Sequence, residues 1–332
     1  MSLALTALGL SLANDGFVLD SGSLAPGQIA LANESRFVEA HFNQPLTTYA
    51  VGGWDRLDLS EELEFFAPAT PVPRRFTYAE WLNAEAFLSD SAPDDLRSIG
   101  ADFKRVEYRS IKTEGKTENR GLTIRLDMDE VAETPNWQQA KTQMLMQRLK
   151  RSALRRAVEA LSAAGVNTAR TWDTTVGKDP DQDVNTTLIT ATTASGLRPN
   201  RVGYGETAWS RRILAHRAQN SAGGFASSSL SEAQLAQFLA VDRVLVSRAR
   251  YQSAPAAKSE VTGNLVLSFY AQSNAAVEDP SNIKRFVSPT ASGGPVRVYL
   301  HQVSAKLWDL TVEHYDLIKI TSTLGIRKET IS

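Results

Sequence analysis

One stretch, from Thr134 to Gly165, most constrains what this 332-residue chain can fold into. Beyond Pro135 it contains no internal Gly or Pro, so about thirty residues predict a helix roughly 45 Å long. Thr134 is the expected N-cap, and Pro135 fits the first helical position, where a missing N–H costs nothing. Gly165 follows the last periodic residue, so we expect it in the left-handed conformation. A helix of this length needs cover along its apolar side.

The expected helix has two contrasting faces. Its apolar arc contains Met146, Leu149, Ala153, Leu154, Ala157, Val158 and Leu161. Lys141, Arg148 and Arg155 recur every seven residues on the opposite arc, and Arg151 and Arg156 flank them. Three environments suit this basic arc: solvent, acidic loops of a neighbouring copy, or nucleic-acid phosphates.

Composition excludes several classes of protein. The net charge is -1, from 36 Lys and Arg against 37 Asp and Glu, which argues against a strongly nucleic-acid-binding or membrane-surface protein. The absence of Cys excludes disulfides, thiolate metal sites and a thiol nucleophile. The apolar run Leu3 to Leu12 is too short to cross a bilayer, and because the first basic residue is Arg36 we expect no signal peptide.

Residues 1–74 show little regular pattern and end in a cluster of prolines. They nevertheless carry too many large apolar groups for a solvated tail, including Phe42, Trp54, Phe65 and Phe66. We therefore expect an extended arm whose side chains are buried by something else. The alternative is a loop-rich subdomain.

The next segment predicts a long β-excursion. Phe76 to Tyr78 begins a strand, and a polar, acidic stretch follows it. A turn-rich piece over 113–121 leads into Leu122, Ile124, Leu126 and Met128, which alternate with polar neighbours. One face of this hairpin is expected to be covered and the other solvated.

Short helices and strands alternate beyond the long helix. We expect a helix closed by Gly196 and capped by Asp183 or an earlier Asp, a strand over 201–204, and a helix over 206–216. A flexible loop over 218–229, a helix from Ser231, and strands over 244–246 and 265–270 follow. This order predicts an α/β subdomain over roughly 183–290. Strands over 296–300 and 307–320 are expected to return beneath the long helix.

Chemical motifs are weak. Gly203-x-Gly205-x-x-Ala208 has a degenerate dinucleotide spacing, and a turn that uses two glycines explains it better. Asp179, Asp181 and Asp183 alternate as in a calcium loop, but positions that need Gly and Glu are Val and Thr, so helix capping is favoured. The histidines His41, His216, His301 and His314 lack metal-ligand spacing, although His301 and His314 could lie on neighbouring strands. We expect no catalytic, cofactor or metal site.

Order and motif together resemble a known family. Lys116-Thr-Glu-Asn-Arg-Gly-Leu122 and Arg125-Leu-Asp-Met-Asp-Glu130 precede the long helix, and Trp172-Asp is followed by Asp179-Pro and a helix. Gly196-Leu-Arg-Pro-Asn-Arg-Val202 and Leu235-Ala-Gln-Phe-Leu-Ala-Val-Asp-Arg-Val-Leu-Val246 come next. Over roughly residues 70–290 the chain resembles the major capsid protein of tailed double-stranded-DNA bacteriophages, which has the Hong Kong 97-type fold.

This resemblance implies an α+β fold with named parts. Residues 1–74 would be the N-terminal arm and 75–125 the β-hairpin called the E-loop. Residues 126–182 and 291–332 would form the peripheral domain, with a spine helix over 135–164, and 183–290 the α/β axial domain. The basic residues Lys141, Arg148, Arg151, Arg155 and Arg156 become candidates for contacts between subunits or with the lumen.

The implied function is structural rather than enzymatic. Subunits would assemble into pentamers and hexamers of an icosahedral phage head that holds double-stranded DNA by non-specific contact. Portal, scaffold or decoration proteins are further partners, no membrane is involved, and assembly would take place in the host bacterial cytoplasm before the protein resides in the virion. Two alternatives remain open: an encapsulin-like protein compartment, and an α/β nucleotide-binding enzyme that uses the Gly203–Ala208 turn.

Overall fold

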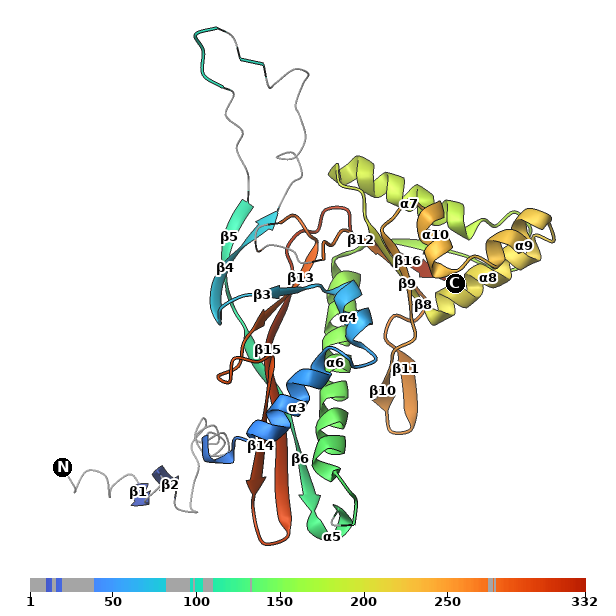
Figure 1. Cartoon of the computed structure of the whole chain (residues 1–332). Helices are drawn as coiled ribbons and strands as arrows, with labels where there is room; N and C mark the ends of the chain where they lie inside the picture. Colours follow the sequence, from blue (N-terminus) through green and yellow to red (C-terminus); the bar gives the residue numbers. More distant parts are fainter. Residues whose placement is uncertain are drawn as a thin grey trace.

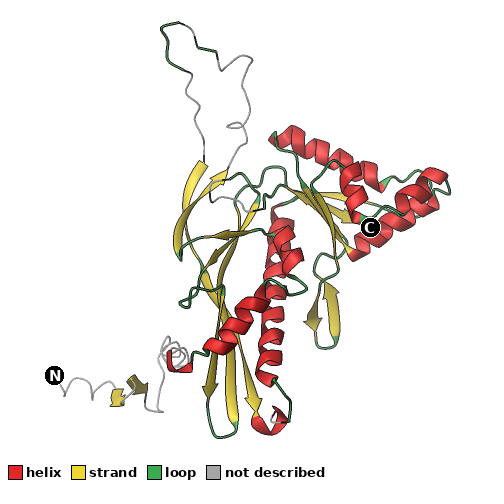
Figure 2. Ribbon diagram, viewed as in Figure 1, coloured by secondary structure: helices red, strands yellow, loops and turns green. Residues whose placement is uncertain are grey.

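Two β-sheets lie on either side of one long helix, as Figures 1 and 2 show. The computed structural model describes residues 10–13, 16–19, 39–81, 96–97, 99–103, 110–131, 133–273, 277 and 279–332. A short antiparallel pair, β1 (Leu10–Ala13) and β2 (Gly16–Leu19), precedes the main body. No helix in these described ranges has the length and apolar character needed to cross a membrane.

The first sheet is built around one long strand, β15 (Leu307–Ile320). One edge of β15 pairs with β6 (Glu118–Asp127), and its other edge pairs first with β14 (Val296–Gln302) and then with β13 (Ile283–Ser288). A short parallel strand, β3 (Ala69–Pro71), extends the sheet beyond β13. The alternation of Leu122, Ile124 and Leu126 is confirmed, because Leu122 and Ile124 pack against the apolar core beneath the long helix and Leu126 is buried.

The second sheet has the strand order β7-β16-β12-β8-β9. Its strands are β7 (Val166–Arg170), β16 (Arg327–Ile331), β12 (Leu265–Phe269), β8 (Arg201–Gly205) and β9 (Arg243–Ser247). The helices of this domain are α7 (Pro180–Ser195), α8 (Glu206–Ala218), α9 (Ala222–Ser228) and α10 (Glu232–Phe238). The predicted α/β domain is therefore present, with a hairpin of β10 (Arg250–Ala254) and β11 (Ala257–Glu260) projecting from it (Figure 1).

The long helix is α6 (Trp137–Ala164), and every residue predicted for its apolar arc is buried. Its first half packs with α3 against the β14–β15 sheet, and its second half packs with α4 against the α/β sheet. The predicted ends are wrong in detail. The N-cap is Asn136, at a φ of 56°, so Thr134 and Pro135 lie outside the helix; the short helix α5 (Met128–Val131) comes just before.

Gly165 is needed for a reason other than the predicted left-handed turn. Its φ is -73° and its ψ 134°, because the chain continues directly into β7. A Cβ atom at this position would lie 3.1 Å from Lys328 Cβ and 3.2 Å from Leu161 O. The glycine therefore allows strand β16 to approach the end of the helix.

The expectation of an extended arm over 1–74 is wrong for its second half. After the short helix η2 (Glu39–His41), the chain forms α3 (Gln44–Trp54) and α4 (Ser60–Phe66), which pack on α6 within the same chain. Phe65 and Phe66 are buried at 1 % and 0 % exposure. These aromatic side chains are therefore buried by other segments of the same chain. Most of residues 1–38 lie outside the described ranges, so the arm remains a prediction there.

The expected β-hairpin is narrower than 75–125. Its paired strands are β4 (Arg75–Trp81) and β5 (Ser110–Lys116), which project from one end of the molecule (Figure 1). Residues 82–95 and 104–109, including the acidic stretch and Val106 with Tyr108, lie outside the described residues. The turn predicted over 113–121 is wrong, because β5 and β6 are separated only by Thr117. Met128 begins α5 rather than ending the strand.

Three further boundaries differ from the prediction. Strand β13 falls within the predicted axial range 183–290 but pairs with β15 in the other sheet. Strand β16 falls within 291–332 but pairs with β7 and β12 in the α/β sheet. The loop predicted over 218–229 contains helix α9, whose N-cap Ser221 accepts a hydrogen bond from Gly224 N at 3.0 Å.

The motifs that carried the resemblance join elements of the fold. Arg201 Nη1 donates to Phe65 O at 2.6 Å and to Glu64 O at 2.9 Å, so it caps the C-terminal end of α4. Asn200 Nδ2 donates to Asp242 at 2.8 Å, and Asn200 Oδ1 accepts from Ala271 N at 2.9 Å. These residues fix β8 against its neighbours.

The packing of α4 generates a stability prediction. Phe66→Ala should lower the free energy of unfolding by about 3–5 kcal/mol, because it opens a cavity between α4, α6 and the α/β sheet. Chemical denaturation of the unassembled chain would measure this change. Tyr49→Ala on α3, where Tyr49 is 37 % exposed, is the control and should cost less than about 1 kcal/mol. Similar small losses for both variants would contradict the assigned position of α4.

Candidate functional site

The predicted basic residues of α6 divide into two groups in the structure. Arg148, Arg151 and Arg155 are exposed, and Lys141 is half-buried. Arg155 is already engaged, since its Nε donates to Glu159 Oε1 at 2.6 Å and its guanidinium lies 4.2 Å from the ring centroid of Tyr251 on β10. We call Lys141, Arg148, Arg151 and Arg155 the basic stripe. Within it, Arg148 and Arg151 are the cations most available to a partner.

Arg156 does not belong to the basic stripe. It turns towards the sheet and donates through Nη2 to Asp316 Oδ2 on β15 at 2.9 Å. Asp316 is 1 % exposed, forms an ion pair with Arg120 on β6 at 3.1 Å, and lies 3.6 Å from His314 Nε2. Burial alone would raise the pKa of Asp316, but the hydrogen bond and charge of His314, with the charge of Arg156, hold it well below its usual range. This carboxylate ties α6 to two strands.

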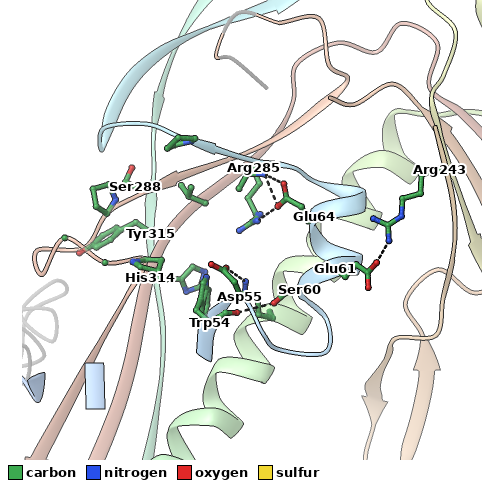
Figure 3. Close-up of a pocket in the computed structure, with 18 residues that line it drawn as sticks. Trp54, Asp55, Ser60, Glu61, Glu64, Arg243, Arg285, Ser288, His314 and Tyr315 are labelled. Atoms are coloured by element: carbon green, nitrogen blue, oxygen red, sulfur yellow. Dashed lines mark hydrogen bonds and ion pairs between the residues drawn. The ribbon is translucent and has the colours of Figure 1, made fainter. Parts of the chain in front are cut away.

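A pocket of about 770 Å³ opens where α3 ends, between α4 and the strands β13 and β15. Figure 3 shows Trp54, Asp55 and Ser60 on one side of it, with His314, Tyr315 and Ser288 on another and Arg285 with Glu64 on a third. Its walls are largely apolar, and its charged members come in pairs.

Lys150 lines this pocket and was missed in the sequence. It is 2 % exposed, its Nζ lies 4.3 Å from the ring centroid of Trp54, and the nearest carboxylate oxygen in an ion pair is Asp55 Oδ1 at 3.9 Å. Burial and then the charge of Arg285 lower the pKa of Lys150 to about 8. The sequence contains a signal for this burial. Position 150 lies four residues after Met146 and three before Ala153, so helical spacing places Lys150 on the apolar arc.

Of the three alternating aspartates over 179–183, helix capping is confirmed for Asp179 alone. Asp179 caps α7 by accepting from Gln182 N at 3.1 Å. Asp181 is buried and accepts from Arg212 Nε at 2.6 Å, and Asp183 accepts from Trp172 Nε1 at 2.9 Å. Within the described ranges, no group of three or more His, Asp or Glu side chains could hold a metal ion.

The four histidines are spread over separate parts of the fold and contact different partners. His301 and His314 do lie on the paired strands β14 and β15. His301, however, contacts His41, with 3.2 Å between their Nδ1 atoms, whereas His314 packs beside Trp54. His216 lies 3.2 Å from Asp181.

Other parts of the chain occupy the space where a side chain on Gly203 or Gly205 would lie. A Cβ on Gly203 would lie 2.6 Å from Phe66 Cε1, and a Cβ on Gly205 would lie 1.8 Å from Gly263 O. All residues of β8 are buried. The predicted turn is wrong, because Gly203 and Gly205 belong to strand β8, and the structure gives both glycines a role in close packing.

Large apolar side chains are exposed at two extremes of the molecule. On the helices of the α/β domain, Ile189, Leu214, Phe225 and Phe238 are between 49 % and 63 % exposed. Beyond the β4–β5 hairpin, Leu96, Ile99 and Phe103 are at least 72 % exposed. Exposed groups of this size, gathered at the ends of a molecule, are typical of surfaces that contact another protein.

No family model and no curated protein matches this chain. Solved structures do match. A phage-related protein from Bordetella bronchiseptica RB50 has a TM-score of 0.62 at 17 % identity, covering 87 % of this chain and 96 % of that one. The capsid of the cyanophage P-SCSP1u has a TM-score of 0.51 at 8 % identity, covering 81 % and 87 %.

This chain has the Hong Kong 97-type capsid fold. The virus-like particle from Pyrococcus furiosus is also similar, with a TM-score of 0.50 at 11 % identity over 88 % of this chain and 100 % of that one. The helix expected as the spine of this fold is α6, and the assignment of the β15 sheet to the peripheral domain stays a prediction. The predicted α+β fold class is confirmed.

The carboxylate beneath the spine helix generates a second prediction. Asp316→Asn should lower the free energy of unfolding by about 3 kcal/mol at pH 7, because the partly buried Arg156 and Arg120 lose the buried carboxylate that they share. The pKa of Asp316 is lowered in the folded state, so its contribution is complete above the unfolded pKa of about 3.9 and is lost as the pH falls through the folded pKa. The gap between the two proteins should therefore narrow below about pH 4.

Denaturant titrations at several pH values measure this gap. Asp129→Asn is the matched control, because Asp129 pairs with Lys306 where both side chains are about two-thirds exposed, and such pairs are worth less than about 1 kcal/mol. A cost for Asp316→Asn no larger than that of the control would show that the buried network contributes little.

Proposed function

We propose that this chain is a major capsid protein, which self-assembles into the pentamers and hexamers of an icosahedral phage head enclosing double-stranded DNA. The observation that carries the proposal is the likeness of nearly the whole chain to a phage-related protein, together with its likeness to a cyanophage capsid. The proposed role is structural and needs no catalytic site. The protein would reside in the virion after assembly in the host bacterial cytoplasm, with portal, scaffold or decoration proteins as further partners.

The exposed surfaces support self-association. Copies that meet through unlike surfaces form rings when the rotation closes, and stable interfaces of this kind commonly bury more than about 2,000 Å². The projecting β4–β5 hairpin and the apolar helices of the α/β domain lie far apart in the molecule (Figure 1). An assembly that used both surfaces would bring each copy into contact with several neighbours. Residues 1–38 are proposed to act as an arm in these contacts.

A protein compartment without a genome, of the encapsulin type, is the second candidate. The observation that favours it is the likeness to the virus-like particle from Pyrococcus furiosus, which is as strong as the likeness to the cyanophage capsid. Nuclease-protected double-stranded DNA inside purified particles would support the phage head. Particles that instead contain a protein cargo and no DNA would support the compartment.

Particle formation is the direct test of both candidates. The purified chain should elute as a megadalton-scale species in size-exclusion light scattering and appear as closed shells in negative-stain electron microscopy. A monodisperse monomer at high concentration would overturn both candidates, because each requires self-association.

The basic stripe is proposed to contact a neighbouring copy or the packaged DNA. Arg148→Glu should then lower the yield of intact particles or their retained DNA several-fold, since it places a like charge opposite the acidic partner. Gradient sedimentation and nuclease-protected DNA measure the two quantities. Lys258→Glu reverses an exposed charge on β11 and is the control for a change in net charge. Unchanged yield and DNA content for Arg148→Glu would leave the stripe as a solvated face.

A further inference from the structure

Two buried cations, Lys150 and Arg285, line the pocket beside Trp54, and their positive charges repel each other. Lys150 is 2 % exposed and Arg285 8 % exposed, and the charge of Arg285 helps to lower the pKa of Lys150. Two like charges in a poorly solvated space raise the local positive potential, which a bound anion would relieve.

The carboxylates already present do not satisfy these cations fully. Glu64 is shared, because its oxygens accept from Arg285 Nη2 at 3.0 Å and from Ala69 N at 3.1 Å. Asp55 is 88 % exposed, and its 3.9 Å distance from Lys150 Nζ is too long for a hydrogen bond. Glu61 is paired with Arg243. Among the described residues, the hydrogen bonds of Arg285 come from Nε and Nη2, and the contacts of Lys150 Nζ are the 3.9 Å ion pair with Asp55 and the ring of Trp54.

The pocket has room for more than an ion. Its volume of about 770 Å³ is in the range of small-molecule sites. Apolar and aromatic side chains form most of the wall: Trp54, Pro71, Val287, Pro289, Pro295 and Tyr315. An inorganic anion would leave these walls uncovered, whereas an organic anion with an aromatic or aliphatic body would cover them.

We propose that this pocket binds a small organic carboxylate, whose anionic end lies between Lys150 and Arg285 and whose apolar body lies against Trp54 and Tyr315. The carboxylate would accept hydrogen bonds from Lys150 Nζ and Arg285 Nη1, and the ring of Trp54 would support both the ammonium group and the ligand. Because Lys150 belongs to the spine helix and Arg285 to β13, an occupied pocket would link α6 to the sheet through the ligand.

Calorimetric titration of the full chain with benzoate tests the proposal. Benzamide, which has the same shape without the charge, and benzylamine, which has the opposite charge, are the comparison ligands. Benzoate should bind at least about tenfold more tightly than either, because only benzoate pairs with both cations. Binding should weaken as the pH rises past about 8, where Lys150 loses its proton.

Two variants locate the site. Lys150→Met keeps the length of the side chain without its charge and should weaken benzoate binding about tenfold or more. Lys258→Met removes an exposed charge outside the pocket and should leave binding unchanged. If Lys150→Met fails to fold, Lys150→Arg retains the cation and should shift the loss of binding to a pH well above 8, since arginine does not deprotonate there.

Three results would overturn the proposal. They are no heat of benzoate binding up to about 10 mM, equal binding of benzoate and benzamide, and equal effects of the Lys150→Met and Lys258→Met substitutions. The assembly proposal does not depend on any of them, because particle formation is measured without the ligand.

Discussion

The apolar arc of α6 is the interaction on which the rest of the molecule depends. Leu145, Met146 and Leu149 belong to the core that joins α3 to the β15 sheet, whereas Ala153 to Leu161 belong to the core that joins α4 to the α/β sheet. A single continuous helix therefore contributes to both cores. Since α6 contains no Pro or Gly at which a helix would kink sharply, it fixes the distance between the two sheets and their relative orientation.

Polar contacts then determine how the sheets are held. On β15, Asp309, Thr311 and Glu313 form a row that strands on both sides satisfy. Arg125 Nε donates to Asp309 at 2.8 Å, the hydroxyls of Thr123 and Thr311 lie 2.8 Å apart, and Tyr299 Oη donates to Glu313 at 2.8 Å. The opposite face of the strand carries Leu310 and Val312 against the helix. Burying this polar row is affordable because each member has a partner.

Much of this architecture could be predicted from local patterns, and the failures have a common cause. The apolar arc of α6, the helix closed by Gly196 and the alternation along β6 each depend on residues close in sequence, and all three are present. Helix α3 contains two adjacent glycines, and α4 is only seven residues long, so neither has a strong period. Phe66 is buried because Gly203 leaves room for it, a contact between distant segments that no local pattern reveals.

In the candidate sites too, features set by residues close in sequence could be predicted, whereas contacts between distant segments could not. The basic stripe followed from helical periodicity, but Arg156 was assigned to it because its partner, Asp316, is distant in sequence. The burial of Lys150 could not be predicted from the helix alone, because a lysine at an apolar position usually marks a break in the buried face. Here Trp54 and Asp55, from a distant segment, lie beside its ammonium group. Pairing partners of β13 and β16 likewise come from far along the chain, which is why the domain limits were misplaced.

The position of β16 has a consequence for synthesis on the ribosome. It inserts between β7 and β12, although the strands of the other sheet, β13 to β15, are made in between. Until residues 327–331 leave the exit tunnel, the α/β sheet has a gap and β12 an unpaired edge. The α/β sheet is therefore completed only when the last strand is made, and until then the open edge of β12 makes the unfinished chain prone to pair with other chains.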